Sequence, residues 1–147
     1  MFNHAPVLIA EDDANDVFLL RRAFQKLGLT HPLVVFHNGQ EAIDYLSTNG
    51  DDANQASTPP PALLFLDLKM PMLDGFDVLS WLQERPPGEK LPIIVLTSSN
   101  QEKDVQRALQ MGADEYHVKP QQFEELMEIV NKVQQRWLKG QTEGNGP

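Results

Sequence analysis

The stretch "LLFLDLKMPMLDGFDVL", residues 63–79, decides the fold class of this chain. It opens with four apolar residues, Leu63 to Leu66, and this run stops at a single carboxylate, Asp67. A short apolar run bounded by polar residues is typical of a strand that is buried on both faces of a parallel sheet. The stretch therefore predicts a buried strand with an acid at its carboxyl end.

The same kind of run recurs along the chain and alternates with segments of helical period. The predicted strands cover residues 7–10, 33–36, 63–66, 93–96 and 115–118. Between them lie helices with one apolar stripe, for example Val17, Leu20, Phe24 and Leu27, or Phe123, Leu126, Val130, Val133 and Trp137. This order, (βα)5, predicts an α/β fold with a doubly wound parallel sheet.

Local signals mark several helix ends. Asn38 stands three residues before Glu41, and Ser99 stands three residues before Glu102, which matches a capping box. Two glycines follow apolar-periodic stretches, where a left-handed helix terminus favours glycine; they are Gly28 and Gly112. These signals place helix starts just after residues 38 and 99, and helix ends just before the two glycines.

Two segments depart from the alternation. Residues 49–62 include three consecutive prolines and are too polar for a helix or a central strand, so we expect an exposed loop or a ragged helix end there. The last residues are mainly Gln, Thr, Glu, Gly, Asn and Pro, a composition typical of disorder. The chain thus predicts one domain, residues 5–138, then a disordered tail, residues 139–147, and no effector domain.

Composition argues against several classes of function. The formal charge of −9 disfavours binding to nucleic acid or to an anionic membrane, because both need clustered Lys and Arg. The chain contains no cysteine, so disulfides and thiolate sites are excluded, which fits a reducing compartment. The first residues have neither a basic region nor an apolar run long enough for a signal peptide or a membrane span. We therefore expect a cytoplasmic protein that is not embedded in a membrane.

Polar side chains follow the predicted strands at one rim of the sheet. In a doubly wound sheet, ligands bind outside the carboxyl ends of the strands, near the point where the strand order switches. The residues that follow strands directly are Glu11, Asp12, Asp13, Asp67, Thr97, Ser98 and Lys119. We expect Asp13 to cap a helix. The rim thus collects three or four carboxylates, a hydroxyl and an ammonium.

Such a cluster needs a cation, because neighbouring carboxylates repel each other and would otherwise take up protons. Mg²⁺ suits the site best, since it binds through one or two carboxylates and leaves room for waters and phosphate oxygens. Lys119 would supply a point charge to a phosphoryl group, and the Thr97 hydroxyl would donate a hydrogen bond to it. The residues therefore predict phosphoryl transfer onto a carboxylate.

Four motifs in this order resemble the receiver domain of two-component response regulators over residues 5–138. They are "VLIAEDD" (7–13), the opening stretch (63–79), "PIIVLTSS" (92–99) and "GADEYHVKP" (112–120). The resemblance implies a flavodoxin-like fold with strand order 2-1-3-4-5. It also implies a stand-alone signalling protein, not an enzyme, that accepts a phosphoryl group from a histidine kinase with Mg²⁺ or Mn²⁺ bound. The output would be phosphorylation-dependent protein contacts.

The resemblance assigns a role to each matching residue. Asp67 would be phosphorylated, and the ligands of the metal would be Glu11, Asp12, Asp67 and the backbone carbonyl of Lys69. Thr97 and Tyr116 would form the switch pair, and Lys119 would bind the phosphate. Pro71 and Gly75 would shape the loop beneath the site, and the Lys119–Pro120 peptide bond would be cis.

The chain departs from the family pattern at two positions. Gln121 replaces an aromatic that often follows "KP", and Lys69 stands where many members have Asn or Met. Neither Lys69 nor Ser99, two residues beyond Asp67 and Thr97, offers a carboxylate or amide to align a water, so we expect a long-lived phosphorylated form.

The proline-rich loop before strand 63–66 and "RWL" near the end resemble the single-domain subclass that partners phytochrome histidine kinases. A homodimer would form through strand 115–118 and the helices on either side of it.

Other classes fit the sequence less well. An aspartyl-phosphate hydrolase of the haloacid dehalogenase type would need a DxDx(T/V) pattern after the first strand, where "EDDAND" stands. A flavin carrier or a nucleotide-binding P-loop would need phosphate-loop motifs that the chain lacks. The four histidines show no zinc-ligand spacing. A degenerate receiver that acts as an unphosphorylated adaptor is the nearest alternative.

Overall fold

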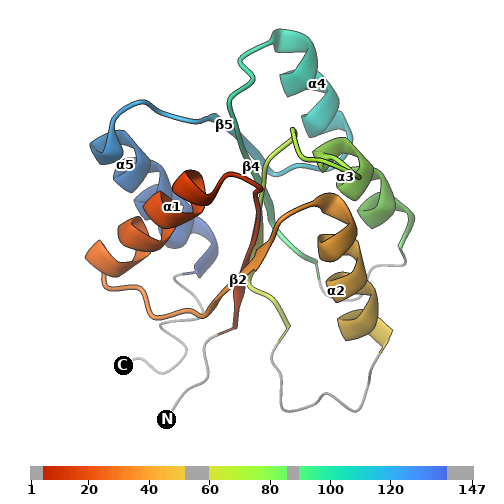
Figure 1. The fold of residues 1–147 in the computed structure, drawn as a ribbon, viewed down its shortest axis with the longest axis horizontal. Coiled ribbons are helices and arrows are strands. Elements are labelled where there is room, and N and C mark those ends of the chain that lie inside the picture. The colour runs from red at the N-terminus through yellow and green to blue at the C-terminus, as the bar shows by residue number, and fades with distance from the viewer. Residues whose placement is uncertain (1–4, 52–59, 86–89, 139–147) are drawn as a thin grey trace.

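The computed structural model describes residues 5–51, 60–85 and 90–138, and these form five strands that alternate with helices (Figure 1). The strands are β1 (Val7–Ala10), β2 (Leu33–Phe36), β3 (Leu63–Leu66), β4 (Ile93–Thr97) and β5 (Glu115–Val118). The helices are α1 (Ala14–Lys26), α2 (Gly39–Asp51), α3 (Gly75–Glu84), α4 (Glu102–Gln110), α5 (Phe123–Val133) and the π-helical turn η1 (Gln134–Leu138). The predicted strands are confirmed, with β4 one residue longer. The predicted tail and most of the predicted loop, residues 139–147 and 52–59, lie outside the described residues.

All strands are parallel, and their order is β2-β1-β3-β4-β5. The chain runs outward from β1 to β2, then crosses back past β1 to β3, so the direction of winding reverses between β1 and β3. In the register of these two strands, Ala10 pairs with Leu66. The residues that follow them, Glu11 and Asp67, are therefore neighbours at the switch point, where doubly wound sheets bind ligands. The predicted flavodoxin-like order is confirmed.

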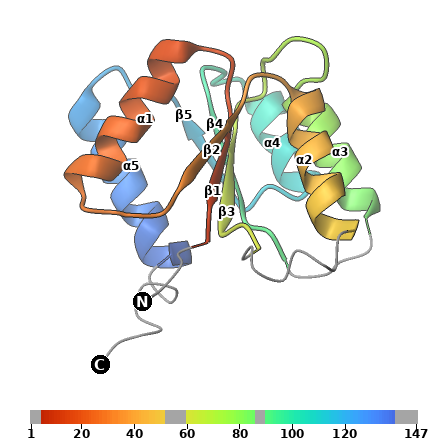
Figure 2. The same cartoon turned by 60° about the horizontal axis from the view of Figure 1, so that its bottom comes forward.

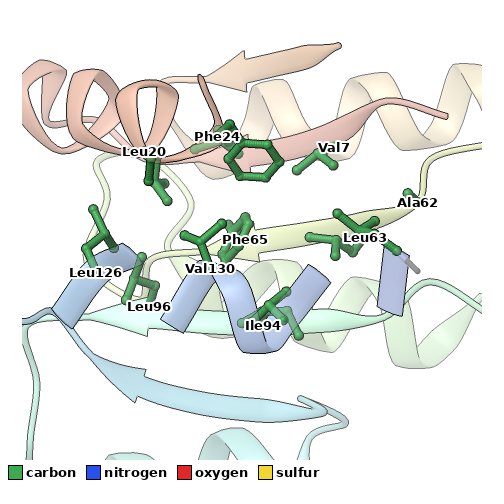
Figure 3. Close-up of a cluster of buried hydrophobic side chains, with 14 of the residues drawn as sticks. Val7, Leu20, Phe24, Ala62, Leu63, Phe65, Ile94, Leu96, Leu126 and Val130 are labelled. Atoms are coloured by element: carbon green, nitrogen blue, oxygen red, sulfur yellow. The ribbon is translucent and has the colours of Figure 1, made fainter. Parts of the chain in front are cut away.

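Helices cover both faces of the sheet. Figure 2 shows α1 and α5 against one face, and α2, α3 and α4 against the other. Because successive side chains of a strand point to opposite faces, β1 and β3 contribute to two separate cores. On the α1 and α5 side, Phe24 meets Phe65 edge to face with ring centroids 6.3 Å apart (Figure 3). The sheet is thus buried on both faces, which holds its carboxyl ends in place.

Two of the predicted helix starts are confirmed. Asp13 caps α1, because its Oδ1 accepts hydrogen bonds from the backbone N–H groups of Asn15 and Asp16. The Asn38 side chain accepts from the N–H of Glu41 at 2.8 Å at the start of α2. Gly28 and Gly112 have φ angles of 73° and 108°, as expected for left-handed helix ends.

Two local predictions are wrong. Ser99 does not cap α4: the N-cap is Gln101, and Ser99 Oγ donates instead to Asp104 Oδ2 at 2.6 Å. The Lys119–Pro120 bond is not cis, since no cis peptide bond occurs in the described part of the chain. A bond before proline still favours trans by about 0.5–1 kcal/mol, and the surrounding fold does not overturn that preference here.

No helix among the described residues is long and apolar enough to cross a membrane.

Candidate functional site

Three carboxylates meet where β1 and β3 end. Ligand atoms of Glu11, Asp12 and Asp67 all lie within 4.8 Å of one another. The Asp67 N–H donates to the Ala10 carbonyl at 3.0 Å, which extends the β1–β3 ladder to the rim. Glu11 and Asp67 are buried, whereas Asp12 is exposed. The structure therefore brings the predicted acidic residues together, with one face open to solvent.

Lys119 reaches this cluster from the end of β5. Its backbone N–H donates to the Thr97 carbonyl at 2.7 Å, which ties the end of β5 to β4. Its Nζ lies 2.8 Å from Glu11 Oε1 and 3.3 Å from Asp67 Oδ2. The predicted ammonium is thus in direct contact with the predicted phosphoacceptor.

Sequence reasoning missed a fourth carboxylate of the site, Asp16. Its Oδ2 lies 2.7 Å from Lys119 Nζ, closer than the nearest oxygen of Glu11 or Asp67. Asp16 belongs to the first turn of α1, three residues after the cap Asp13. The first turn of a helix that follows a central strand must lie at the rim, so this position was the available signal.

The electrostatics of the cluster show a shortage of positive charge. Burial raises the pKa of Glu11 to about 7, the negative charge of Asp67 adds to this rise, and hydrogen bonds from Lys119 and the Asp13 N–H offset only part of it. For Lys119, burial alone would lower the pKa, but its hydrogen bonds to Asp16 and Glu11 and the charge of Asp67 raise it. Lys119 therefore stays charged, and one ammonium faces several carboxylates.

The donor set fits a hard divalent cation. Carboxylate oxygens that converge within one ligand-sized region are what Mg²⁺ and Mn²⁺ prefer, and an added cation would offset the burial and the Asp67 charge that raise the Glu11 pKa. The Lys69 N–H donates to Asp67 Oδ1 at 3.3 Å, and the Lys69 side chain is exposed. The role of the Lys69 carbonyl as a metal ligand stays a prediction.

The predicted switch residues lie beside the cluster on β4 and β5. Thr97 is fully buried, and its Oγ1 has no hydrogen-bond partner among the described residues. Leaving a buried hydroxyl without a hydrogen bond costs free energy. Thr97 Oγ1 is therefore available to form a hydrogen bond with a ligand atom. Tyr116 donates its hydroxyl to the Ser99 carbonyl at 2.9 Å. Burial raises the Tyr116 pKa, which keeps this hydroxyl a neutral donor.

The loop after β3 packs closely beneath Asp67. The Gly75 N–H donates to the Leu68 carbonyl at 3.1 Å, and a Cβ at Gly75 would lie 2.5 Å from the Asp67 carbonyl oxygen. Met72 has a φ of 65°, which is uncommon for a residue with a side chain. Only glycine fits at position 75, so the start of α3 can lie directly against the backbone of Asp67.

The family model of the response regulator receiver domain matches residues 7–131. The chain is 32% identical to the probable methanogenesis regulatory protein FilR2 of Methanothrix harundinacea, over 96% of this chain and 88% of that protein. It is 29% identical to the response regulator Rcp1 of Synechocystis, over 90% of this chain and 88% of Rcp1.

Solved structures agree with these relatives. The Mn²⁺-bound form of Rcp1 superposes with a TM-score of 0.77 at 27% identity, covering 92% of this chain and 95% of that one. The phosphorylated cyanobacterial phytochrome response regulator RcpA superposes with a TM-score of 0.80 at 28% identity, with the same coverage of 92% and 95%. The fold, the residues at the rim of the sheet and the sequence all indicate one family. The chain belongs to the response regulator receiver domains and is a relative of Rcp1 and RcpA.

Proposed function

We propose that Asp67 accepts a phosphoryl group from a histidine kinase and that the phosphorylated chain signals through protein contacts. One observation carries this proposal: the buried Asp67 carboxylate lies 3.3 Å from the Lys119 ammonium, at a rim whose buried Thr97 hydroxyl lacks a partner in the described structure. An acceptor, a cation and a free hydrogen-bond donor are the parts that phosphoryl transfer requires.

In the proposed transfer, an Asp67 carboxylate oxygen forms a bond to phosphorus while the N–P bond of the donor's phosphohistidine breaks. The electron pair of that bond stays on the imidazole ring of the donor, and the ring takes up one proton from solvent and leaves as neutral imidazole. Lys119 provides positive charge to the phosphoryl oxygens, and Thr97 Oγ1 donates a hydrogen bond to one of them. Mg²⁺ or Mn²⁺, held by Glu11, Asp12, Asp67 and the Lys69 carbonyl, would neutralise further negative charge.

Two relatives support the proposal by what their structures contain. Rcp1 has been seen with Mn²⁺ bound, and RcpA has been seen phosphorylated. RcpA is a phytochrome response regulator, so we place the partner kinase of this chain in the phytochrome class. The output surface would be α4, β5 and α5, because Tyr116 lies on β5 and contacts the loop before α4 through Ser99. A homodimer through this surface is one form that the output can take.

The direct test is intact-mass measurement after incubation with acetyl phosphate and Mg²⁺. The wild type should gain one phosphate, and Asp67→Asn should gain none. Asp44→Asn, which removes an exposed carboxylate of α2, is the matched control and should be labelled like the wild type. Undiminished labelling of Asp67→Asn would refute the assignment, and an unlabelled wild type that still binds its kinase would favour the adaptor alternative.

A further inference from the structure

Asp16 holds the ammonium of the site from outside the predicted metal-binding set. Lys119 Nζ is 2.7 Å from Asp16 Oδ2, against 2.8 Å for Glu11 and 3.3 Å for Asp67. Asp16 does not belong to the group of carboxylates that converge within 4.8 Å, which consists of Glu11, Asp12 and Asp67. Asp16 therefore contacts the Lys119 ammonium, but it is not placed to share a metal ion with the other three carboxylates.

We propose that Asp16 is a positioning residue that keeps Lys119 beside Asp67 during phosphoryl transfer. The proposal rests on the function proposed above. It assigns a role in the reaction to a carboxylate of α1 that contacts the lysine and not the phosphoryl group.

The hydrogen-bonding capacity of the ammonium explains why a third carboxylate matters. A lysine ammonium has three N–H donors, and here three carboxylates surround it. A divalent ion bound by Glu11 and Asp67 would compete for their oxygens and weaken their hold on Lys119. Asp16 would keep its full charge and its hydrogen bond. The N–H directed at Asp67 could then turn to a phosphoryl oxygen while the nitrogen stays in place.

A purely structural role for Asp16 would act through α1 alone. An acidic residue in the first turn of a helix is favoured by the helix dipole, whatever the lysine does. The N-cap itself is Asp13, so Asp16 is not needed for capping. A structural role and a positioning role therefore differ in one respect: only the second disappears when Lys119 is replaced.

A double-mutant cycle separates the two roles. The four proteins are the wild type, Asp16→Asn, Lys119→Met and the double variant, and the rate of phosphate uptake from acetyl phosphate with Mg²⁺ is measured by intact mass. We expect Asp16→Asn to slow uptake by roughly three- to tenfold in the wild-type background. In the Lys119→Met background, the same change should alter the rate by less than about twofold. Equal slowing in both backgrounds, or none in the wild type, would overturn the proposal.

A second readout does not depend on phosphate. The midpoint of urea unfolding is measured without divalent ions. Asp16→Asn should lower this midpoint more in the wild-type background than in the Lys119→Met background. Glu124→Gln, which removes an exposed first-turn acid from α5, is the matched control and should change neither readout. A wild type that takes up no phosphate would refute the proposed function and this role together. A wild type that does, with Asp16→Asn matching the control, would refute this role alone.

Discussion

Two buried glutamates lie at opposite ends of the sheet and differ in how well they are neutralised. Glu11 follows β1 at the rim, and its pKa is raised to about 7, first by burial. Glu115 begins β5 at the other end; burial alone would raise its pKa too, but hydrogen bonds with His117, Trp137 and Arg136 outweigh burial and lower it. Both carboxylates are thus buried, and their hydrogen-bond partners decide whether the pKa rises or falls.

The difference lies in the number of donors for each carboxylate. Trp137 Nε1 and Arg136 Nη1 donate to Glu115 Oε2 at 2.8 and 2.9 Å, and His117 Nε2 lies 2.8 Å from Oε1. Glu11 instead accepts one backbone N–H, that of Asp13, and shares a single ammonium with two other carboxylates. A buried carboxylate with enough donors to offset its burial stabilises the fold, whereas one with too few is suited to binding a cation.

The largest effect should come from Glu115→Gln. The amide cannot satisfy three donors as a carboxylate does, and it leaves Arg136 without its buried partner, so the free energy of unfolding should fall by about 2–3 kcal/mol. Urea unfolding monitored by circular dichroism measures this change. A loss below about 0.5 kcal/mol, the usual range for an exposed position, would show that the donors around Glu115 contribute little.

Glu11→Gln should separate binding from stability. It removes one of the crowded charges, so without divalent ions the free energy of unfolding should stay within about 0.5 kcal/mol of the wild type or rise. Mg²⁺ affinity, measured by calorimetric titration, should fall at least about tenfold, or about 1.4 kcal/mol, because an oxygen ligand loses its charge. A loss of stability as large as that of Glu115→Gln would remove the contrast between the two ends.

The pH dependence of stability should reveal how much the charge of Glu115 stabilises the fold. Its pKa is lower in the folded protein than the ordinary 4.5, so its contribution is complete above that value and is lost as the pH falls through the folded-state pKa. The difference in unfolding free energy between the wild type and Glu115→Gln should therefore be constant near pH 7 and shrink toward pH 3. A difference that does not depend on pH would mean that the charge of Glu115 is not what stabilises this end.

The smallest effect should come from Lys69→Asn. Lys69 is exposed two residues after Asp67, and its long side chain can cover a phosphoryl group without helping to align a water. An asparagine amide can orient that water, so the phosphorylated variant should lose phosphate about two- to fivefold faster after the donor is removed. Intact mass over time measures the loss. Equal decay in the two proteins would show that Lys69 does not determine the lifetime.

The strands and the acidic rim were predictable because each depends on a local pattern. A buried strand of a parallel sheet must be a short apolar run, and Glu11 and Asp67 directly follow such runs. Asp16 was not predictable in this way, since its partner Lys119 is 103 residues away in the chain. The Glu115 cluster escaped prediction for the same reason, as Arg136 and Trp137 lie 21 and 22 residues further on.

The error at Ser99 arose because two partners compete for one hydroxyl. The spacing of Ser99 and Glu102 fits a capping box, but the Ser99 hydroxyl donates to Asp104 instead, in the same first turn of α4. Sequence spacing shows which bonds are possible and not which is formed. A capping box does occur at the start of α3, between Asp74 and Asp77, where two aspartates take the places of the usual residues.

The contact between Trp137 and Glu115 gives this protein an optical signal from one end of its sheet. Indole emission is sensitive to a charge beside the ring nitrogen, and Trp137 Nε1 is 2.8 Å from a carboxylate oxygen. The other tryptophan, Trp81 on α3, has a different neighbour, the Arg85 guanidinium 4.5 Å above its ring. One tryptophan therefore senses a negative charge and the other a positive one, on opposite faces of the sheet. Their emission spectra should differ in wavelength, so fluorescence can follow η1 and α3 separately.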